Sequence, residues 1–309
     1  MYNECQKSRY LNFLKEKNSG SINMYDWLFN KIEEFELKLS KDVYDFTFEE
    51  VIYMYKMFNL REISTLSTIN TMLSQYTKWA ISEGLVKINQ NVMSLISVDK
   101  LTEFLNKAAL NLKIISREEL LQITKELENP RDQFILLALF EFGKGENFYD
   151  IVFAKTEAIN YQESTMTLYS GRTVEISREL IHYALDSSET VSYVRTFADG
   201  SIRNYQLYDN GTIIKTTKSK TDKDRLAANT YVTATKCLKE AGTNLSVKNI
   251  IESGKIHFIK EDMKKLDISS LEEYLSCPEK NERIERIKNQ FMIPRIVVKR
   301  FINTYGDLF

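Results

Sequence analysis

The feature that most constrains this chain is the stretch of residues 130–177. It begins with an almost continuously apolar helix, 131–142, which a glycine ends. A short second helix, 147–153, precedes two strand-like runs, and the second run, 164–176, contains a Ser-Gly hairpin turn at 170–171. A helix that is apolar on all sides must be buried, so the stretch predicts the centre of a domain that mixes helices with a small sheet.

Length and composition favour two helical domains. At 309 residues the chain is too long for one compact core. It has only 10 glycines and 3 prolines, which favours long helices with short connections. The expected fold class is therefore mainly α with a small β-sheet, an α+β protein. The net charge of −1 argues neither for nor against nucleic acid, because only the local distribution of charge decides that question.

The cysteines and the hydropathy pattern favour a reducing, cytoplasmic location. Cys5, Cys237 and Cys277 are odd in number and widely spaced, and they form no metal-binding pattern. The amino terminus lacks the apolar core of a signal peptide, and no run approaches the ~20 apolar residues that a membrane span needs. We expect no metal, no cofactor and no membrane contact.

Residues 1–96 have the periodicity of a small helical bundle. Apolar residues recur at helical spacing in four segments, and Thr47 with Glu50 forms a capping box at the start of the third. The fourth segment starts near Ser64 or Ser67. Its apolar positions are Leu66, Ile69, Leu73, Tyr76, Trp79 and Ala80.

Three motifs in this region resemble, in order, the core-binding domain of tyrosine recombinases, the family of the phage integrases. They are KDVYDFTFEEV at 41–51, LSQYTKWAISEG at 73–84 and KINQNV at 87–92, where Gln90 replaces the family's usual proline. The helix, turn, helix and sheet order of residues 130–177 resembles the start of that family's catalytic domain. The resemblance implies a SAM-like helical core-binding domain at 1–96, a helical linker at 97–112, and a recombinase-like domain at 113–309 with a β-hairpin elaboration at about 190–216.

The resemblance also implies that the fourth helix lies in the major groove of double-stranded DNA. Its small hydroxyl and amide groups, with one lysine, would contact phosphates and base edges. The candidate residues are Ser64, Ser67, Thr68, Asn70, Thr71 and Lys78. The alternative is a capped helix surface that faces solvent.

A second group of candidate DNA contacts lies in the recombinase-like domain. The hydroxyl-rich segment 215–225 carries five basic residues and two aspartates, which suits phosphate contact, although a solvated loop has the same composition. With other basic residues near the motifs, the candidates are Lys144, Arg172, Lys215, Lys218, Lys220, Lys223, Arg225 and Lys248.

The groups with which tyrosine recombinases cut DNA are largely missing. In that family two arginines stabilise the phosphoryl oxygens, and loss of one such donor typically costs ~10²–10³ in rate. The stretch that matches the first arginine motif, 142–149, has Gly145 in the arginine's place. The best match for the second motif, 245–251, has Lys248 at its histidine and Ile251 at its arginine.

The remaining catalytic positions are equally altered. The stretch 290–293, which begins with Gln290, is the nearest counterpart of the family's Leu-Gly-His motif, and Arg172 lies near the turn that carries the family's lysine. Tyr305 is the candidate nucleophile. Without its arginines a tyrosine is an unactivated phenol with a pKa near ~10, so we interpret Tyr305 as vestigial and expect no catalytic residue.

The last two helices, predicted at 282–291 and 295–302, are amphipathic and basic. In the resembled family the final helix often packs on a neighbouring protomer. The apolar residues Ile296, Val297, Phe301 and Ile302 permit such self-association, and they permit packing into the protein's own core equally well.

The leading hypothesis is a sequence-specific double-stranded DNA-binding protein that uses a recombinase fold without strand cleavage. A phage transcriptional repressor that maintains lysogeny by occupying operators on the bacterial nucleoid fits this description. One rival is an active, divergent recombinase with Tyr305 as nucleophile, which would form a covalent adduct with DNA. The other is a helical protein-interaction module, which would show no salt-sensitive retention of DNA.

Overall fold

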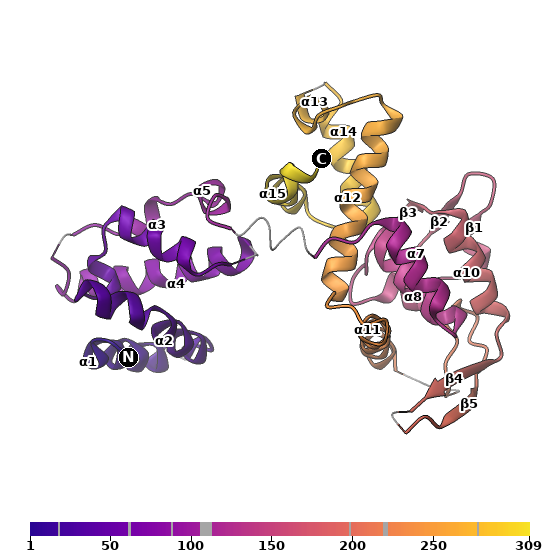
Figure 1. The fold of residues 1–309 in the computed structure, drawn as a ribbon, viewed down its shortest axis with the longest axis horizontal. Helices are drawn as coiled ribbons and strands as arrows, with labels where there is room; N and C mark the ends of the chain where they lie inside the picture. The colour runs from indigo at the N-terminus through magenta and orange to yellow at the C-terminus, as the bar shows by residue number, and fades with distance from the viewer. Residues whose placement is uncertain are drawn as a thin grey trace. The chain divides into compact units, whose positions relative to one another are not determined.

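The computed structural model describes residues 1–17, 19–60, 63–87, 89–105, 113–197, 199–218, 222–276 and 278–309, except the side chains of Asn303 and Asp307. It divides into two compact units, Met1–Leu112 and Lys113–Phe309 (Figure 1). The described residues are mostly helical, with a three-stranded and a two-stranded antiparallel sheet, so the expected fold class is confirmed. None of the helices in the described ranges is long and apolar enough to span a membrane.

The first unit is a bundle of helices around an aromatic core. Its elements are α1 (Glu4–Glu16), α2 (Ile22–Leu39), η1 (Val43–Asp45), α3 (Phe48–Met57), α4 (Ile63–Ser82), η2 (Val92–Leu95) and α5 (Val98–Thr102). The predicted capping box forms, because Thr47 and Glu50 exchange side-chain to backbone hydrogen bonds at the start of α3. Every apolar position predicted for the fourth helix is buried in α4.

The segment predicted as the linker begins as part of the first unit. Leu101, Phe104 and Leu105 are buried in the same core as α4. Burying three large apolar side chains fixes residues 97–105 on the bundle. The remainder of the predicted linker, residues 106–112, lies outside the described residues.

The second unit is built around α8 (Pro130–Phe142), in which every side chain from residue 134 to residue 140 is buried. Helices α7 (Arg117–Glu126) and α10 (Arg178–Glu189) pack against it. The sequence also predicts a capping box at residues 116–119, and Ser116 and Glu119 form it at the start of α7. The short α9 (Tyr149–Val152) and η3 (Thr156–Ala158) lead into strands β1 (Ile159–Asn160), β2 (Thr165–Thr167) and β3 (Thr173–Glu175).

The sheet has the order β1-β2-β3, so β3 is an edge strand. Its neighbour pairs in the register Thr165↔Glu175, across the hairpin turn predicted at Ser170-Gly171. The next elements are β4 (Ser192–Thr196), β5 (Ile202–Gln206), α11 (Lys223–Glu240) and α12 (Val247–Lys265). The unit ends with α13 (Leu271–Ser276), α14 (Lys280–Phe291), α15 (Arg295–Tyr305) and η4 (Gly306–Leu308).

Helix α12 crosses α8 at a point where only glycine fits. A Cβ built on Gly254 would lie 1.7 Å from the carbonyl oxygen of Phe140, so the two backbones are in direct contact. The carboxyl-terminal half of α12 then meets α14 and α15 in a separate apolar cluster around Ile259, Ile287 and Phe301. Helix α12 thus connects α8 to the carboxyl-terminal helices.

Within 190–216 the sequence predicts two or three strands around turns at Asp199-Gly200 and Asn210-Gly211, and only the first turn joins paired strands. Residues 192–196 and 202–206 pair across the Asp199-Gly200 turn. The segment around Asn210-Gly211 instead makes a turn closed by a single bridge, Tyr208↔Thr216. Ile213 and Ile214 are buried against the α8 core, so burial draws this segment inward and no third strand is present in the described ranges.

Candidate nucleic-acid interface

Helix α4 presents a polar stripe on the side opposite its apolar face. Ser64, Thr68, Thr71 and Lys78 are exposed and recur at spacings of four, three and seven residues, which places them on one face. Apart from one lysine the stripe is uncharged. A surface of this kind can approach base edges without repelling phosphates.

The two threonine hydroxyls of this stripe are oriented by their own helix. Thr68 Oγ1 donates to the carbonyl oxygen of Ser64 at 2.8 Å, and Thr71 Oγ1 donates to that of Ser67 at 2.9 Å. The lone pairs of both hydroxyls therefore remain available as acceptors. In the major groove, the partners that suit them are the amino groups of adenine and cytosine.

Asn70, another residue of the predicted DNA-binding set, is used inside the first unit. Its Oδ1 accepts from the hydroxyl of Tyr55 at 2.8 Å, and its Nδ2 donates to the carbonyl oxygen of Met93 at 3.2 Å. The amide thus ties α4 to α3 and η2. Ser67 is half-buried beside it.

A basic cavity in the second unit gathers three of the predicted contacts. It has a volume of about 110 Å³ and lies between the start of α8, the segment before α11, and the first turns of α11. Its cations are Arg131, Lys215, Lys218 and Arg225, and its other walls include threonines and Asn229. A space of this size holds a few waters, at ~30 Å³ each, or one phosphate group.

The charges around this cavity are only partly balanced. Lys215 is 8% exposed, and its Nζ donates to the backbone carbonyl of Thr190 at 3.2 Å. Arg131 Nε contacts Asp132 Oδ1 at 3.2 Å, but burial raises the pKa of that carboxyl and weakens its anionic character. Lys218 and Arg225 are exposed, and in the described part of the chain neither forms an ion pair. The cavity therefore favours an anion.

Arg131 was missed by the sequence analysis, which treated its helix only as a buried core element. A signal was present. Arg131 follows Pro130 in the first turn of α8, where a cation opposes the helix dipole. A basic residue at such a position indicates a role other than helix stability.

The other exposed lysines of the predicted set lie over aromatic rings or at helix starts. Lys223 lies 5.3 Å from the ring centre of Tyr149, and Lys144 lies 5.9 Å from that of Phe148. Lys248 is exposed in the first turn of α12. Lys220 lies outside the described residues.

Arg172 has a side chain that is only 7% exposed, and it connects several elements of the second unit. Its guanidinium contacts Asp150 through Nε and Nη2, both at 2.9 Å, and Nη2 also donates to the carbonyl of Phe142 at 3.0 Å. Nη1 donates to the carbonyls of Asn289, at 2.8 Å, and Gln290. All five donors of the guanidinium are thus engaged within the protein.

The space beside Gly145, the position that the resemblance assigns to the first catalytic arginine, is filled by another side chain. Gly145 has φ +61°, and a Cβ added to it would lie 2.3 Å from the Asp150 carboxylate. That carboxylate also accepts from the backbone N–H and the hydroxyl of Ser170, at 2.8 and 3.1 Å, besides its ion pair with Arg172. The motif turn therefore closes on an aspartate and leaves no space for a side chain at position 145.

The counterparts of the two arginine motifs nevertheless meet in space. A Cβ on Gly143 would lie 3.7 Å from the side chain of Ile251, the residue at the second arginine's place, and 3.6 Å from the ring of Phe291. Gly143, Ile251 and Phe291 thus form an apolar contact. Such a surface stabilises no developing negative charge.

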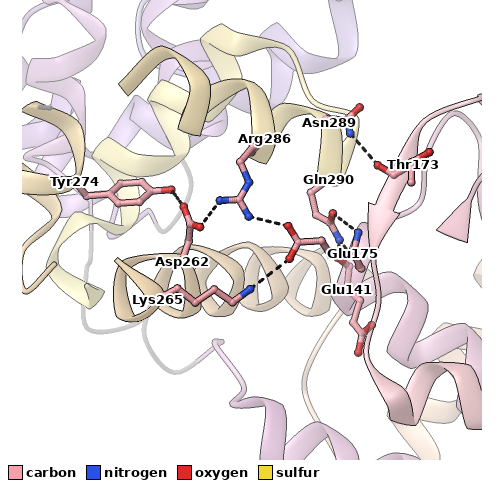
Figure 2. A network of polar contacts seen from close by, with 9 residues as sticks. All are labelled: Glu141, Thr173, Glu175, Asp262, Lys265, Tyr274, Arg286, Asn289 and Gln290. Carbon is pink, nitrogen blue, oxygen red and sulfur yellow. Dashed lines mark hydrogen bonds and ion pairs between the residues drawn. The ribbon is translucent and has the colours of Figure 1, made fainter. Parts of the chain in front are cut away.

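Gln290 ties the edge of the sheet to α8 and α14 (Figure 2). Its Nε2 donates to the carbonyls of Glu141 and Glu175, each at 2.8 Å, and its Oε1 accepts from the Glu175 N–H at 3.0 Å. Beside it, Asn289 Nδ2 donates to the Thr173 carbonyl at 2.9 Å. The two amides act on β3 as a neighbouring strand would and cover its open edge.

Figure 2 also shows that Arg286 is neutralised by two carboxylates. It contacts Glu175 Oε1 of β3 at 2.7 Å and Asp262 Oδ1 of α12. Asp262 in turn accepts from the hydroxyl of the buried Tyr274 at 2.6 Å, and Lys265 lies 3.4 Å from Glu175. This network joins β3, α12, α13 and α14.

Tyr305 lies at the end of α15 in the carboxyl-terminal apolar cluster. Its ring centre is 4.7 Å from that of Phe301, and Phe301 and Ile302 are buried within the same unit. Of the four residues considered for self-association, two thus pack into the protein's own core. Ile296 is 56% exposed.

No group of three or more His, Cys, Asp or Glu side chains among the described residues is arranged to hold a metal ion. The residues considered for DNA contact thus form two separate surfaces. One is the polar face of α4 in the first unit, and the other is the basic cavity with its flanking lysines in the second unit.

Comparison with known proteins supplies two family matches. Residues 1–82 match the model of the MrpR N-terminal core-binding domain, and residues 114–305 match that of the MrpR C-terminal catalytic domain. The SPbeta prophage-derived uncharacterized protein YopR of Bacillus subtilis (strain 168) is 27% identical over 242 residues, which cover 75% of this chain and 73% of YopR. The crystal structure of a lambda integrase(75-356) dimer bound to a COC' core site aligns with a TM-score of 0.43 and 13% identity, covering 99% of this chain and 97% of the integrase chain.

Proposed function

We propose that this chain, which belongs to the MrpR family of tyrosine-recombinase-like proteins, binds double-stranded DNA at specific sequences and does not cut it. The core-binding and catalytic domain matches cover both compact units. The proposal concerns what these two domains do in this chain.

The proposed loss of strand cleavage rests on one observation. The positions of both catalytic arginines are occupied by residues that cannot stabilise a phosphorane, Gly145 and Ile251, and the space at position 145 is closed by Asp150. The Asp150 carboxylate at that point is paired with Arg172 and only accepts hydrogen bonds, so it offers no stabilisation to a phosphoryl oxygen. Because each lost donor typically costs ~10²–10³ in rate, a tyrosine in this setting would cleave too slowly to matter.

Two surfaces support the retention of DNA binding. The stripe of α4 offers hydroxyl acceptors and Lys78 for the major groove. The basic cavity offers Lys215, Lys218 and Arg225 to a backbone phosphate, and Lys144, Lys223 and Lys248 add exposed positive charge on the same unit. Arg172 and Asn70 take no part in the proposed contacts, because their polar groups are already bound within the protein.

We infer further that the protein is a repressor of phage genes that maintains lysogeny. Its relative YopR is prophage-derived, and a binding protein without strand cleavage acts on DNA by occupancy alone. Occupancy of operators would exclude polymerase from nearby promoters. Specific binding should weaken steeply as salt rises, because phosphate contacts release counterions.

Genome-wide mapping of DNA occupancy in a lysogen tests this proposal. The expected result is a small set of sites within the prophage, next to promoters whose transcription rises when the gene is deleted. An absence of enriched sites, together with no salt-sensitive retention of prophage DNA in vitro, would instead identify a protein-interaction module. Occupancy confined to attachment sites, with covalently linked DNA, would identify an active recombinase.

A further inference from the structure

The β4–β5 hairpin projects from the helices of the second unit as a two-stranded arm (Figure 1). All side chains of its two strands are exposed or half-exposed. A two-stranded hairpin without a buried face is marginally stable and adds little to a core. The arm therefore has a purpose other than packing.

The base of the arm is fixed to the start of α8. The carboxamide of Asn129 donates to the Val194 carbonyl at 3.0 Å and accepts from the Val194 N–H at 2.8 Å. On the other face of the strand, the hydroxyl of Tyr193 donates to Asp132 Oδ2 at 3.0 Å. These contacts set the direction of the arm while its outer half stays in solvent.

Two arginines lie side by side on the outer half. Arg195 and Arg203 are direct cross-strand partners, and their guanidinium carbons lie 4.9 and 5.1 Å from the ring centre of Phe197. Like charges directly opposite each other destabilise a hairpin. In the described ranges no carboxylate forms an ion pair with either one, and the nearby turn residue Asp199 accepts from the N–H and hydroxyl of Ser201.

This arrangement is costly for the free protein and useful for an anionic partner. Phe197 holds both guanidinium groups together, so little side-chain freedom is lost when they bind. The base of the arm also lies beside the basic cavity. Arg131, which lines that cavity, lies 4.0 Å from the ring centre of Tyr193 at the base of the arm.

We propose that the β4–β5 arm enters a groove of duplex DNA and that Arg195 and Arg203 contact the DNA there. A two-stranded antiparallel ribbon has the width that the major groove of B-form DNA admits. The cavity beside the base of the arm then holds a backbone phosphate at the groove's edge. This inference rests on the proposed function, since it assigns a DNA contact to an element outside the sites considered above.

The test compares the full-length wild-type protein with a full-length double variant that carries both Arg195→Ala and Arg203→Ala. Binding to a mixed-sequence duplex of about 40 base pairs is measured by fluorescence anisotropy over a salt series. Loss of two phosphate-type contacts lowers the slope of log K against log salt by about 2, and lowers affinity at about 0.1 M salt by on the order of 10- to 100-fold. Replacing both arginines with lysine keeps the charges and restores the slope.

The matched control is Arg178→Ala with Lys280→Ala, which removes the same charge from exposed first turns of α10 and α14. Its slope stays at the wild-type value if the arm is a specific contact. A second measurement needs no mutation. Hydrogen exchange of residues 192–206 in the wild-type protein should slow when the duplex is added.

An alanine pair with the wild-type slope, or arm amides that exchange equally fast with and without DNA, would overturn this inference while leaving the proposed function intact. A wild-type protein that shows no salt-dependent binding of any duplex would contradict the proposed function itself. The two failures are therefore distinguishable.

Discussion

At the residue scale, the turn at position 145 is closed by an aspartate. Gly145 adopts a left-handed backbone with φ +61°, and the Asp150 carboxylate occupies the space where its side chain would begin. Asp150 is held there by Arg172 and Ser170. The packing of the second unit thus excludes a larger side chain at position 145.

Gly145→Ala should therefore destabilise the second unit by about 3–5 kcal/mol, because the new methyl group displaces a buried ion pair. Gly171→Ala is the matched control: Gly171 has φ +82° but open space around it, so only backbone strain of about 1–2 kcal/mol is expected. Urea unfolding followed by circular dichroism measures both. Equal effects of the two substitutions would show that the aspartate does not fill position 145.

A second residue-scale feature is a buried polar cluster in the first unit. The ammonium of Lys7 contacts Glu36 and lies close enough to Asp42 to act on its charge, and all three residues are buried. Burial raises the pKa of Glu36 to about 8, and burial also raises the pKa of Asp42. One ammonium cannot neutralise two carboxylates, so the folded unit keeps a proton that the unfolded chain releases.

The stability of the first unit should therefore fall as pH rises from about 5 to 8. A carboxyl with a raised folded pKa stabilises fully below its unfolded pKa, and this contribution is lost through the folded value of about 8. The slope is at most about 1.4 kcal/mol per pH unit. Asp42→Asn should flatten it, because one carboxylate then faces one ammonium.

Tryptophan fluorescence measures this effect in the first unit alone, since Trp27 and Trp79 are the chain's two tryptophans. Urea unfolding at pH 5, 6.5 and 8 gives the slope for the wild type and the variant. A wild-type unit whose stability is constant or rises over this range would rule out the shared proton.

At the element scale, α4 carries side chains with two different roles: some hold the first unit together, and others are exposed and available for the proposed DNA contact. Asn70 faces α3 and η2, where its amide makes two hydrogen bonds, whereas Lys78 faces solvent. A change at either position should therefore affect only one of the two properties.

Asn70→Ala should lower the stability of the first unit by about 1–3 kcal/mol, because the buried Tyr55 hydroxyl loses its acceptor. Lys78→Ala should leave stability unchanged and reduce the salt slope of DNA binding by about 1. Tryptophan fluorescence during urea unfolding measures the stability of the first unit, and fluorescence anisotropy over a salt series measures DNA binding. A Lys78→Ala protein with an unchanged slope would remove α4 from the proposed interface.

The edge of the small sheet depends on α14. Gln290→Ala removes three hydrogen bonds to β3 and α8 and should cost about 2–4 kcal/mol. Asn289→Ala removes one exposed bond to Thr173 and should cost less than about 1 kcal/mol. Circular dichroism in urea distinguishes them, and an equal loss from both would show that the Gln290 amide does not support β3.

The sequence predicted the elements well and their polar contacts poorly. Periodicity and capping signals located α3, α4, α7 and α8, because helix ends depend on local residues such as Thr47 and Ser116. The fold also brings Ile251 next to Gly143, a contact that no sequence signal predicted.

Contacts between distant residues were beyond the sequence. Arg172 looked like a free cation near a turn, and only the fold brings Asp150 and the end of α14 to it. Nor did Asn210-Gly211, a strong hairpin signal, form a second strand pair, because burial of Ile213 outweighed local turn preference.

At the scale of the whole molecule, the chain combines the core-binding and catalytic domains of a tyrosine-recombinase-like protein. The polar face of α4 belongs to one unit, and the basic cavity and β4–β5 arm belong to the other. Each unit thus carries its own proposed contact with DNA. Binding by both would give the steep salt dependence expected of many phosphate contacts.

The central claim, binding without cutting, is tested most directly with operator fragments identified by occupancy mapping. A set of duplexes carries a nick moved one base at a time, so that any strand attack releases a short fragment and traps a covalent complex. Each sample is divided between a native gel and a denaturing gel. We predict retention on the native gel and no protein-linked DNA on the denaturing gel at any nick position, whereas a denaturant-resistant adduct that Tyr305→Phe abolishes would contradict the account.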